Sequence, residues 1–462
     1  MASSTAVMVA DTVKKDVVYS AECFDESCKP LDASTKLLVE YSVVALEARL
    51  MAPGDQHDTI KYIDASIKII SGCLAIGAFA FPPAAPVLAA IAAVGAGISF
   101  LMKLIPDNRP DPVVEKYKEL QALIHQLEDK MTAHFADMQA FISEHTFDVN
   151  IATQSATLMQ FMRNCIQYQN EGDVKNFARE YEKNAPVDLA YTLGNFLDFE
   201  STNPLLMAMK TEKVKTKATF NKWKTIITGI LGELLFIETF ASGLLNKTKH
   251  NQESIVEQWD ELTASLEKWE NDYKNDQQYW TELKNDFDKY FIDHTHLNNI
   301  QKAEELKKRL DNCLTHDAFY ICVFNSTRKE TDYTYYCESE KEQLIIASDK
   351  GRCNAFVYRS RKGAKYGQAV YEKLKGQVRE CEDQLNWKGS LNNIIKDQLL
   401  NKSLVPGYGF YCLMGSMHCD PQIYYLNSPE PDWFYKGPGH STKLLMNRDG
   451  GKQEYHFIVS FK

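Results

Sequence analysis

The densest group of chemically reactive side chains in this 462-residue sequence is a set of seven cysteines in its last third. No two of them have the Cys-x-x-Cys spacing that is typical of structural zinc sites. The chain holds eleven cysteines in all, and an odd number leaves at least one thiol unpaired even under oxidising conditions. The pattern therefore favours buried thiols in strands over a metal site. The seven residues are Cys313, Cys322, Cys337, Cys353, Cys381, Cys412 and Cys419.

A search for catalytic motifs finds one near match. The segment from Gly439 to Lys443 resembles the Gly-x-Ser-x-Gly nucleophile elbow, in which a serine lies on a tight turn between a strand and a helix. Lysine stands where that turn requires glycine, so Ser441 is expected to be an ordinary turn serine. Neither a Gly-x-x-x-x-Gly-Lys phosphate loop nor a His-Glu-x-x-His pair is present. We expect no enzyme, and no catalytic residue, cofactor or metal.

The strongest pattern is a stretch without any charged residue between Lys68 and Lys103. Proline breaks helices, so Pro82, Pro83 and Pro86 should divide the stretch into a hairpin of two arms. As helices the arms span roughly 20 Å and 28 Å, against about 30 Å for a bilayer core. The residues predicted to insert into a membrane are Leu74, Ile76, Phe79, Phe81, Pro82, Pro83, Pro86, Val87, Ala89, Ile91, Ala93, Gly97, Ile98, Phe100 and Leu101.

Two structural explanations of this hairpin remain open. Ala85, Ala89, Ala93 and Gly97 recur every four residues, a spacing that lets two helices approach closely in a membrane. A helix that is apolar on every side is equally typical of the centre of a water-soluble helical bundle. The hairpin is therefore either inserted into lipid or buried permanently.

Charge limits the partners that the protein can have. The formal net charge is -10, which argues against nucleic acid. A second apolar segment, residues 225–245, is interrupted only by Glu233 and Glu238. The basic residues before it either contact anionic lipid headgroups or form a solvated helix face. They are Lys210, Lys213, Lys215, Lys217, Lys222 and Lys224.

The start of the chain, residues 1–15, lacks the charged and then apolar pattern of a secretory signal. We therefore expect a cytoplasmic or membrane-associated protein, or one that is secreted by an unconventional route.

Helical periodicity dominates the first 310 residues. Asp111 and Pro112 form a strong helix start, and a coiled-coil-like seam of apolar residues follows from Tyr117 to Phe141. A second seam runs from Ile255 to Tyr290 and predicts another helix of more than thirty residues. Shorter helices are expected at 153–169, 174–183, 189–199 and 216–245.

After residue 312 the pattern changes to short aromatic and β-branched runs separated by Gly, Pro, Asn and Ser. They predict strands at 318–324, 333–337, 354–358, 408–412, 423–426 and 455–459, one helix at 367–387, and tyrosines on the surface. The predicted fold is a mainly α, elongated N-terminal helical bundle with a buried hydrophobic hairpin, plus a smaller β-rich (α+β) C-terminal domain. The expected domains are a poorly ordered segment at 1–34, the bundle at 35–312 and the β-rich domain at 313–462.

One family shows the same order of features. The match includes the apolar run from Ile67 to Leu104, the Pro-rich segment Ile105–Val114, and the end of the following long helix, Met131–Met138. In this order the chain resembles the box-jellyfish (cubozoan) pore-forming toxins and the vertebrate rapunzel-like proteins. The resemblance implies a helical bundle like the pore-forming domain of insecticidal crystal toxins, and a β-rich domain that recognises cell surfaces.

Two functions follow from the resemblance. In the first, the protein is a cytolysin-like pore former: the hairpin leaves the bundle, inserts into a lipid membrane and forms homo-oligomers along its small residues. In the second, the bundle never opens, and the protein is a non-lytic intracellular scaffold or regulatory interaction protein of the rapunzel type. The missing signal peptide favours the second. In both, the C-terminal domain is expected to contact a cell-surface or protein partner.

Overall fold

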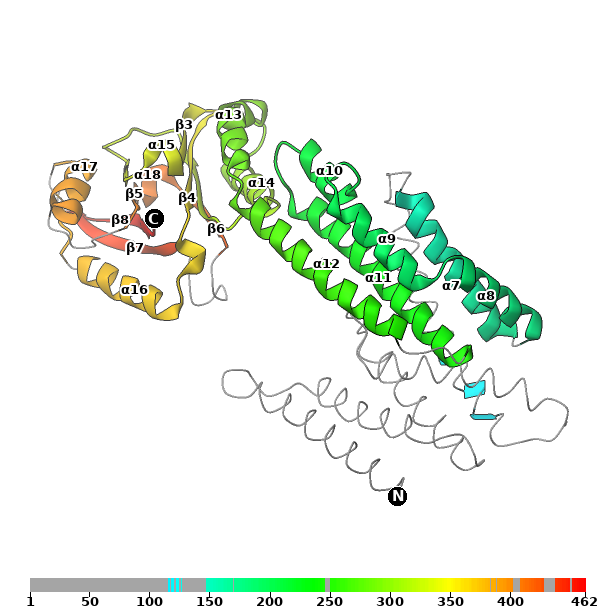
Figure 1. Cartoon of the computed structure of the whole chain (residues 1–462). Helices are drawn as coiled ribbons and strands as arrows, with labels where there is room; N and C mark the ends of the chain where they lie inside the picture. Colours follow the sequence, from blue (N-terminus) through cyan, green and yellow to red (C-terminus); the bar gives the residue numbers. More distant parts are fainter. Residues whose placement is uncertain are drawn as a thin grey trace, which may run out of the picture. The chain divides into compact units, whose positions relative to one another are not determined.

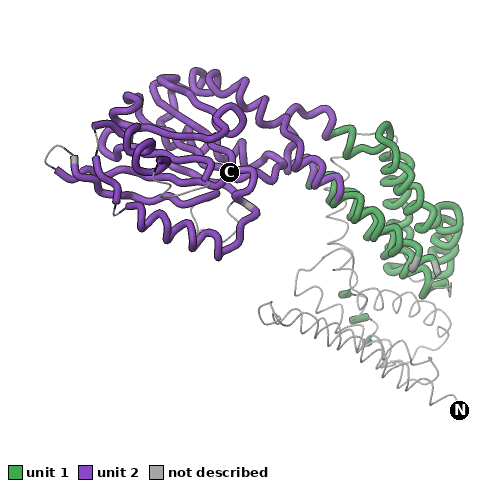
Figure 2. Tube along the Cα trace, turned by 60° about the vertical axis from the view of Figure 1, so that its left-hand side comes forward, with its two compact units in different colours: residues 1–208, 221–267 green, residues 209–220, 268–462 purple. Residues whose placement is uncertain are grey.

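The computed structural model describes residues 147–168, 170–245, 250–382, 384–387, 389–401, 408–427, 437–448 and 451–462, and a few positions between 115 and 126. The chain divides into two compact units (Figure 2), residues 1–208 with 221–267 and residues 209–220 with 268–462. Helices in the first part and antiparallel sheets near the C-terminus confirm the predicted fold class. The predicted N-terminal segment, the hairpin and most of the 117–141 seam lie outside the described residues.

Helices make up the described part of the first unit (Figure 1), and three of them, α10, α11 and α12, extend past its limits. Their ends follow local rules. The Asn170 side chain accepts a hydrogen bond from the Asp173 amide and begins one helix, and Pro186 occupies the first position of the next. The elements are η1 (Asp148–Ala152), α7 (Thr153–Tyr168), α8 (Glu171–Lys183), α9 (Pro186–Asp198), α10 (Pro204–Thr211), α11 (Lys217–Leu244) and α12 (His250–Asn275).

The second apolar seam forms two helices, so the prediction of one long helix there is wrong. α12 ends at Asn275, and α13 (Gln278–Asp293) begins three residues later. Asp276 causes the break, because its carboxylate accepts the Gln278 amide at 2.8 Å and so starts a new helix. Next comes α14 (Asn299–Asp311), which opens with a capping box between Asn298 and Gln301.

In the part of the chain that the structure describes, eight strands form two four-stranded antiparallel sheets. Their orders are β3-β4-β1-β6 and β2-β5-β8-β7. All six predicted strands exist, and two further strands, β3 and β7, were not predicted. Ser441 lies within β7, paired with Ile458, and not in a turn. The strands are β1 (Ala318–Asn325), β2 (Tyr333–Cys337), β3 (Leu344–Lys350), β4 (Cys353–Ser360), β5 (Phe410–Gly415), β6 (Gln422–Leu426), β7 (Gly439–Arg448) and β8 (Gly451–Ser460).

The second unit has four layers, helices on both sides of two stacked sheets (Figure 1). One apolar cluster lies between the sheets and draws side chains from both, among them Phe356 and Cys412. α13 and α14 cover the other face of the first sheet. This is why they belong to the second unit, whereas the sequence placed the boundary at residue 312. The second sheet is covered by α16 (Gln368–Glu382), α17 (Leu391–Asn393) and η3 (Ile394–Leu400).

Many tyrosines of the sheets are inside, which corrects the expectation that they lie on the surface. Tyr320, Tyr358, Tyr411 and Tyr455 are each at most 2% exposed. Tyr358 stacks on Phe410 with ring centroids 4.5 Å apart and donates its hydroxyl to the Phe461 carbonyl at 2.7 Å. Because both faces of each sheet are covered, an aromatic strand residue points into a core on either side.

Candidate functional site: an apolar core helix

Every residue of the predicted insertion hairpin, from Leu74 to Leu101, lies outside the described residues, so the hairpin stays a prediction. The second apolar segment is described. It forms α11, a helix of 28 residues, or roughly 42 Å. Within the described residues α11 is long and apolar enough to span a membrane, and 83% of its most apolar window is buried. Length and composition do not distinguish a membrane helix from a core helix, so its contacts decide.

The centre of α11 is buried on every side. All thirteen residues from 229 to 241 are buried, which is more than three turns of helix. An amphipathic helix would expose at least one face over this length. α11 is therefore a central helix of the first unit.

One of the two carboxyl groups inside this stretch has a single hydroxyl partner. Glu233 is 3% exposed, and its Oε2 accepts a hydrogen bond from Ser155 Oγ of α7 at 2.8 Å. Burial raises the pKa of Glu233 to about 8, and the Ser155 hydrogen bond opposes that rise. At pH 7 this carboxyl group is mostly protonated, so it adds almost no charge to α11.

The other carboxyl group faces a tyrosine. Glu238 is fully buried, and its two oxygens lie 2.8 Å and 2.9 Å from the Tyr181 hydroxyl of α8. Asn251 Nδ2 donates to the same hydroxyl at 3.3 Å. Burial is the main cause that raises the pKa of Tyr181 well above its ordinary value, and the neighbouring Glu238 is the second. Five residues separate the two glutamates, or roughly 140° of helix rotation, so they face different neighbours.

Aromatic side chains fill the rest of this interface. Phe240 of α11 meets Phe177 of α8 edge-on with ring centroids 5.4 Å apart. Trp223 meets Phe147 at 6.0 Å, and Phe147 in turn meets Phe196 of α9 at 6.3 Å. These contacts and the two polar ones fix both the rotation and the height of α11 against its neighbours.

The basic residues around the start of α11 are solvated to different degrees. Lys217 lies 3.7 Å from the Asp311 carboxylate, and Lys215 donates to the Glu212 carbonyl at 2.5 Å. Lys213 is exposed. Their predicted contact with anionic lipid stays a prediction.

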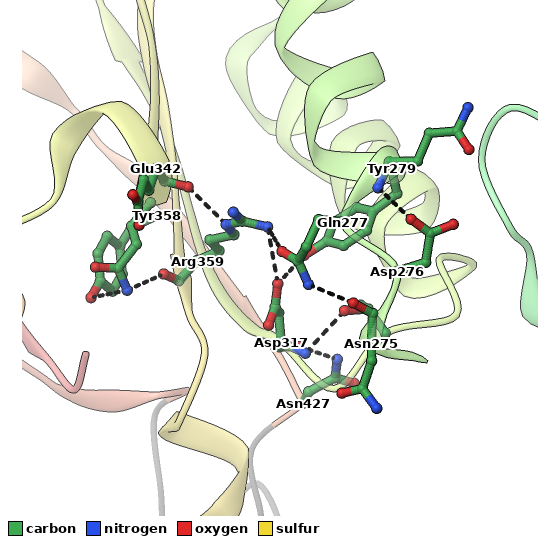
Figure 3. A network of polar contacts seen from close by, with 12 residues as sticks. Asn275, Asp276, Gln277, Tyr279, Asp317, Glu342, Tyr358, Arg359 and Asn427 are labelled. Atoms are coloured by element: carbon green, nitrogen blue, oxygen red, sulfur yellow. Dashed lines mark hydrogen bonds and ion pairs between the residues drawn. The ribbon is translucent and has the colours of Figure 1, made fainter. Parts of the chain in front are cut away.

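The second unit holds a buried polar network (Figure 3). Arg359 of β4 lies 3.4 Å from the Asp317 carboxylate, and its guanidinium covers the Trp280 ring at 4.6 Å. Tyr279 donates to the same carboxylate, and Gln277 accepts from Arg359. Arg359, Asp317, Tyr279 and Gln277 thus share their polar groups within one core, an arrangement suited to holding the start of α13 on the sheet.

The described cysteines are free, and they are buried as the sequence predicts. Cys322, Cys337, Cys353 and Cys412 lie in strands, whereas the expectation of a strand is wrong for Cys313, Cys381 and Cys419. Burial raises the pKa of the Cys165 thiol to about 12, which suppresses thiolate chemistry. No group of three metal-ligating side chains occurs in the part of the chain that the structure describes.

A shallow pocket of about 360 Å³ lies at one end of the second sheet. It includes side chains of both charges, Asp332, Lys452 and Glu454, and has no uniform character.

Glu233 and Glu238 stand out in the sequence, whereas their hydrogen-bond donors, Ser155 and Tyr181, do not. Each donor is one polar atom on an otherwise apolar helix face, which is the only signal that the sequence offers.

A comparison with protein families matches residues 115–453 to a family described as "Protein of unknown function (DUF684)". Neither the search of curated proteins nor that of solved structures returns a match.

Proposed function

The chain belongs to the DUF684 family, and from its own residues we propose that it is a membrane-active protein, like a pore-forming toxin, that inserts its hairpin into a lipid bilayer. The inserting residues are those from Leu74 to Leu101. Homo-oligomers on the membrane would form along Ala89, Ala93 and Gly97 of the hairpin. The C-terminal unit would contact the cell surface or a protein partner.

The observation that supports this proposal is the complete burial of the centre of α11, residues 229–241. A bundle that encloses thirteen consecutive residues of one helix can keep a segment that is apolar on every side away from water. The hairpin has the same need, because residues 69–102 carry no charge at all. Leaving the bundle for lipid exchanges one apolar environment for another, so the two states can be close in free energy.

The contacts of α11 favour the hairpin, and not α11, as the element that moves. Transfer of α11 into lipid would break the Ser155–Glu233 and Tyr181–Glu238 hydrogen bonds. It would also place two carboxyl groups in hydrocarbon without these partners, and burying a polar group without its hydrogen bond is costly even when the group is neutral. The hairpin has no such groups. α11 therefore stays with α7 and α8.

The alternative is a non-lytic scaffold or regulatory interaction protein. The same burial supports it, since a helix whose apolar centre is covered by its own bundle needs no membrane partner. The two functions differ in one observable, the release of vesicle contents.

The test is dye release by the full-length protein from vesicles of phosphatidylcholine and phosphatidylglycerol. We expect release by the natural sequence, and its loss in Ala93→Asp, because the new carboxylate would lie at the centre of an inserted arm. Ala218→Asp is the matched control: it adds the same group at an exposed position in the first turn of α11 and should leave release unchanged.

Hydrogen exchange on the same samples tests which element moves. We expect the α11 amides to stay protected when vesicles are added. Absence of release at every lipid composition and pH would reject the membrane function in favour of the scaffold. Release accompanied by lost protection in α11 would reject the assignment of the moving element.

A further inference from the structure

We infer that residues 278–460 are an internal duplication, two copies of one helix-helix-four-strand motif, each of which completes its sheet with a strand from the other copy. The first half is residues 278–360, from α13 to β4, and the second is residues 368–460, from α16 to β8. The inference does not depend on the proposed membrane function.

The strand orders are the first evidence. The first sheet is β3-β4-β1-β6, and the second, taken from its other edge, is β7-β8-β5-β2. We match β1 with β5, β2 with β6, β3 with β7 and β4 with β8. Replacing each strand of the first sheet by its match, with β6 replaced by β2, then gives the order of the second sheet. All neighbouring strands are antiparallel in both sheets.

The register of the central strand pairs agrees with the same match. Tyr320 pairs with Tyr358 between β1 and β4, and both side chains lie in the cluster between the sheets. Their counterparts are Cys412 and Ile458, which pair between β5 and β8 and lie in the same cluster.

The neighbouring residue on each of these strands belongs to the cluster on the outer, helix-covered face of its sheet, in both halves. Ile321 pairs with Val357 in the first half, and both belong to the outer cluster of the first sheet. Leu413 pairs with Phe457 in the second half, and both belong to the outer cluster of the second sheet.

The flanking strands keep this register too. Tyr425 of β6 pairs with Tyr320, and Tyr335 of β2 pairs with Cys412. Tyr335 and Tyr425 are therefore equivalent positions with the same residue. On the other side, Ala347 of β3 pairs with Ala355, and Leu444 of β7 pairs with Tyr455.

The covering helices repeat in the same order. α13 packs against β3 and α16 against β7, which are equivalent strands. α14 packs against β6, whereas α17 and η3 pack against β2, again an equivalent pair. A pair of helices therefore precedes four strands twice in the chain and covers the corresponding outer face each time.

The ends of the two halves meet as a two-fold axis requires. The match that makes Ser360 equivalent to Ser460 also makes Lys362 equivalent to Lys462. The Lys362 amide donates to the Lys462 carbonyl at 3.0 Å. Equivalent residues contact each other only near a two-fold axis, so this hydrogen bond locates the axis.

The exchange of β2 and β6 joins the halves. The first sheet gains its β6 edge from the second half, and the second sheet gains its β2 edge from the first. The connections that carry these strands across touch: the Gly415 amide donates to the Asp332 carbonyl at 2.8 Å, and Cys419 Sγ donates to the same oxygen at 3.3 Å. They also differ, since the second half places a short helix, α18 (Ser416–Cys419), where the first has a loop.

Cleavage of the full-length protein between the halves tests the inference. A recognition sequence for a specific protease is inserted at Gly367, which is exposed and has open space around it. The matched control carries the same insertion at Gly389, an exposed glycine inside the second half, between α16 and α17. Each cleaved protein is unfolded in urea, refolded, and analysed by native mass spectrometry and size exclusion.

We expect the Gly367-cleaved chain to recover a one-to-one complex of its two fragments, because each fragment contains a whole motif and lacks only the exchanged strand. The Gly389-cleaved chain should lose this recovery, because the cut separates α16 from the strands that it covers. Equal recovery after both cuts, or recovery after the Gly389 cut alone, would overturn the inference, as would failure after the Gly367 cut. If the uncut chain does not refold, co-expression of the same fragment pairs replaces refolding in this comparison.

Discussion

The two compact units bury a carboxyl group in opposite ways. In the second unit, Asp317 is 4% exposed, and its carboxylate is shared between a guanidinium and a tyrosine hydroxyl (Figure 3). In the first unit, Glu233 is 3% exposed and has one serine hydroxyl as its partner. Among the described residues it forms no ion pair. Equal burial therefore accompanies very different electrostatics.

The difference shows what each unit can tolerate. A carboxylate that is paired with arginine has a cation beside it and fixes the geometry around it. A carboxyl group without a cation avoids the desolvation penalty by holding a proton, as the raised pKa of Glu233 indicates. The stability of the first unit should therefore depend on pH through Glu233, whereas that of the second should depend on an intact ion pair.

The largest effect is expected from breaking that ion pair. Arg359→Met leaves the Asp317 carboxylate buried without its cation, which costs about 3–5 kcal/mol in comparable cases. Urea unfolding followed by tryptophan fluorescence measures the loss, because Trp280 lies under the guanidinium. Arg361→Met, two residues along at an exposed position, is the control and should change the stability little.

A second substitution shows whether the unpaired charge causes the loss. Asp317→Asn added to Arg359→Met removes the uncompensated carboxylate and should restore part of the lost stability. A loss that Asp317→Asn does not reduce would instead point to the missing packing of the arginine stem.

Sequence patterns predicted the elements that depend on local periodicity. Aromatic runs marked six of the eight strands, and the apolar run at 225–245 marked α11. β7 was missed because His440, Ser441, Thr442 and Lys443 give its first half no apolar signal, as is common for a strand at the edge of a sheet. The break at Asp276 was missed because apolar residues keep a helical spacing on both sides of it.

Pairings between distant residues could not be predicted from one sequence. Ser155 and Glu233, or Asp317 and Arg359, are brought together only by tertiary structure. The duplication was missed for a related reason. Equivalent strands share which face is buried more than they share residues, and identities such as Tyr335 with Tyr425 and Ser360 with Ser460 are few.

A second prediction, with an effect of similar size, tests the proton on Glu233. Its pKa is about 8 in the folded state against 4.5 for an ordinary glutamate, so between these pH values the folded state holds a proton that the unfolded state has lost. Stability therefore falls as pH rises through this window, by about 1.4 kcal/mol per pH unit. Glu233→Gln cannot titrate and should remove this dependence, so that it is more stable than the natural sequence at pH 8.

Urea unfolding followed by circular dichroism at pH 5, 6, 7 and 8 measures the slope. Glu182→Gln, at an exposed position of α8, removes the same charge from the surface and should keep the slope of the natural sequence. Equal slopes for Glu233→Gln and the natural protein would show that Glu233 does not hold the proton.

The smallest effect is expected at the second glutamate of α11. Tyr181→Phe removes the hydroxyl that lies 2.8 Å from Glu238 but keeps the ring, which packs 6.1 Å from Phe177. The loss should be about 1 kcal/mol, the usual net value of one hydrogen bond. Tyr191→Phe, on the exposed side of α9, should cost less than half of that. A loss at Tyr181 as large as that of Arg359→Met would mean that α11 depends on a charged pair as the second unit does, and the contrast between the units would not hold.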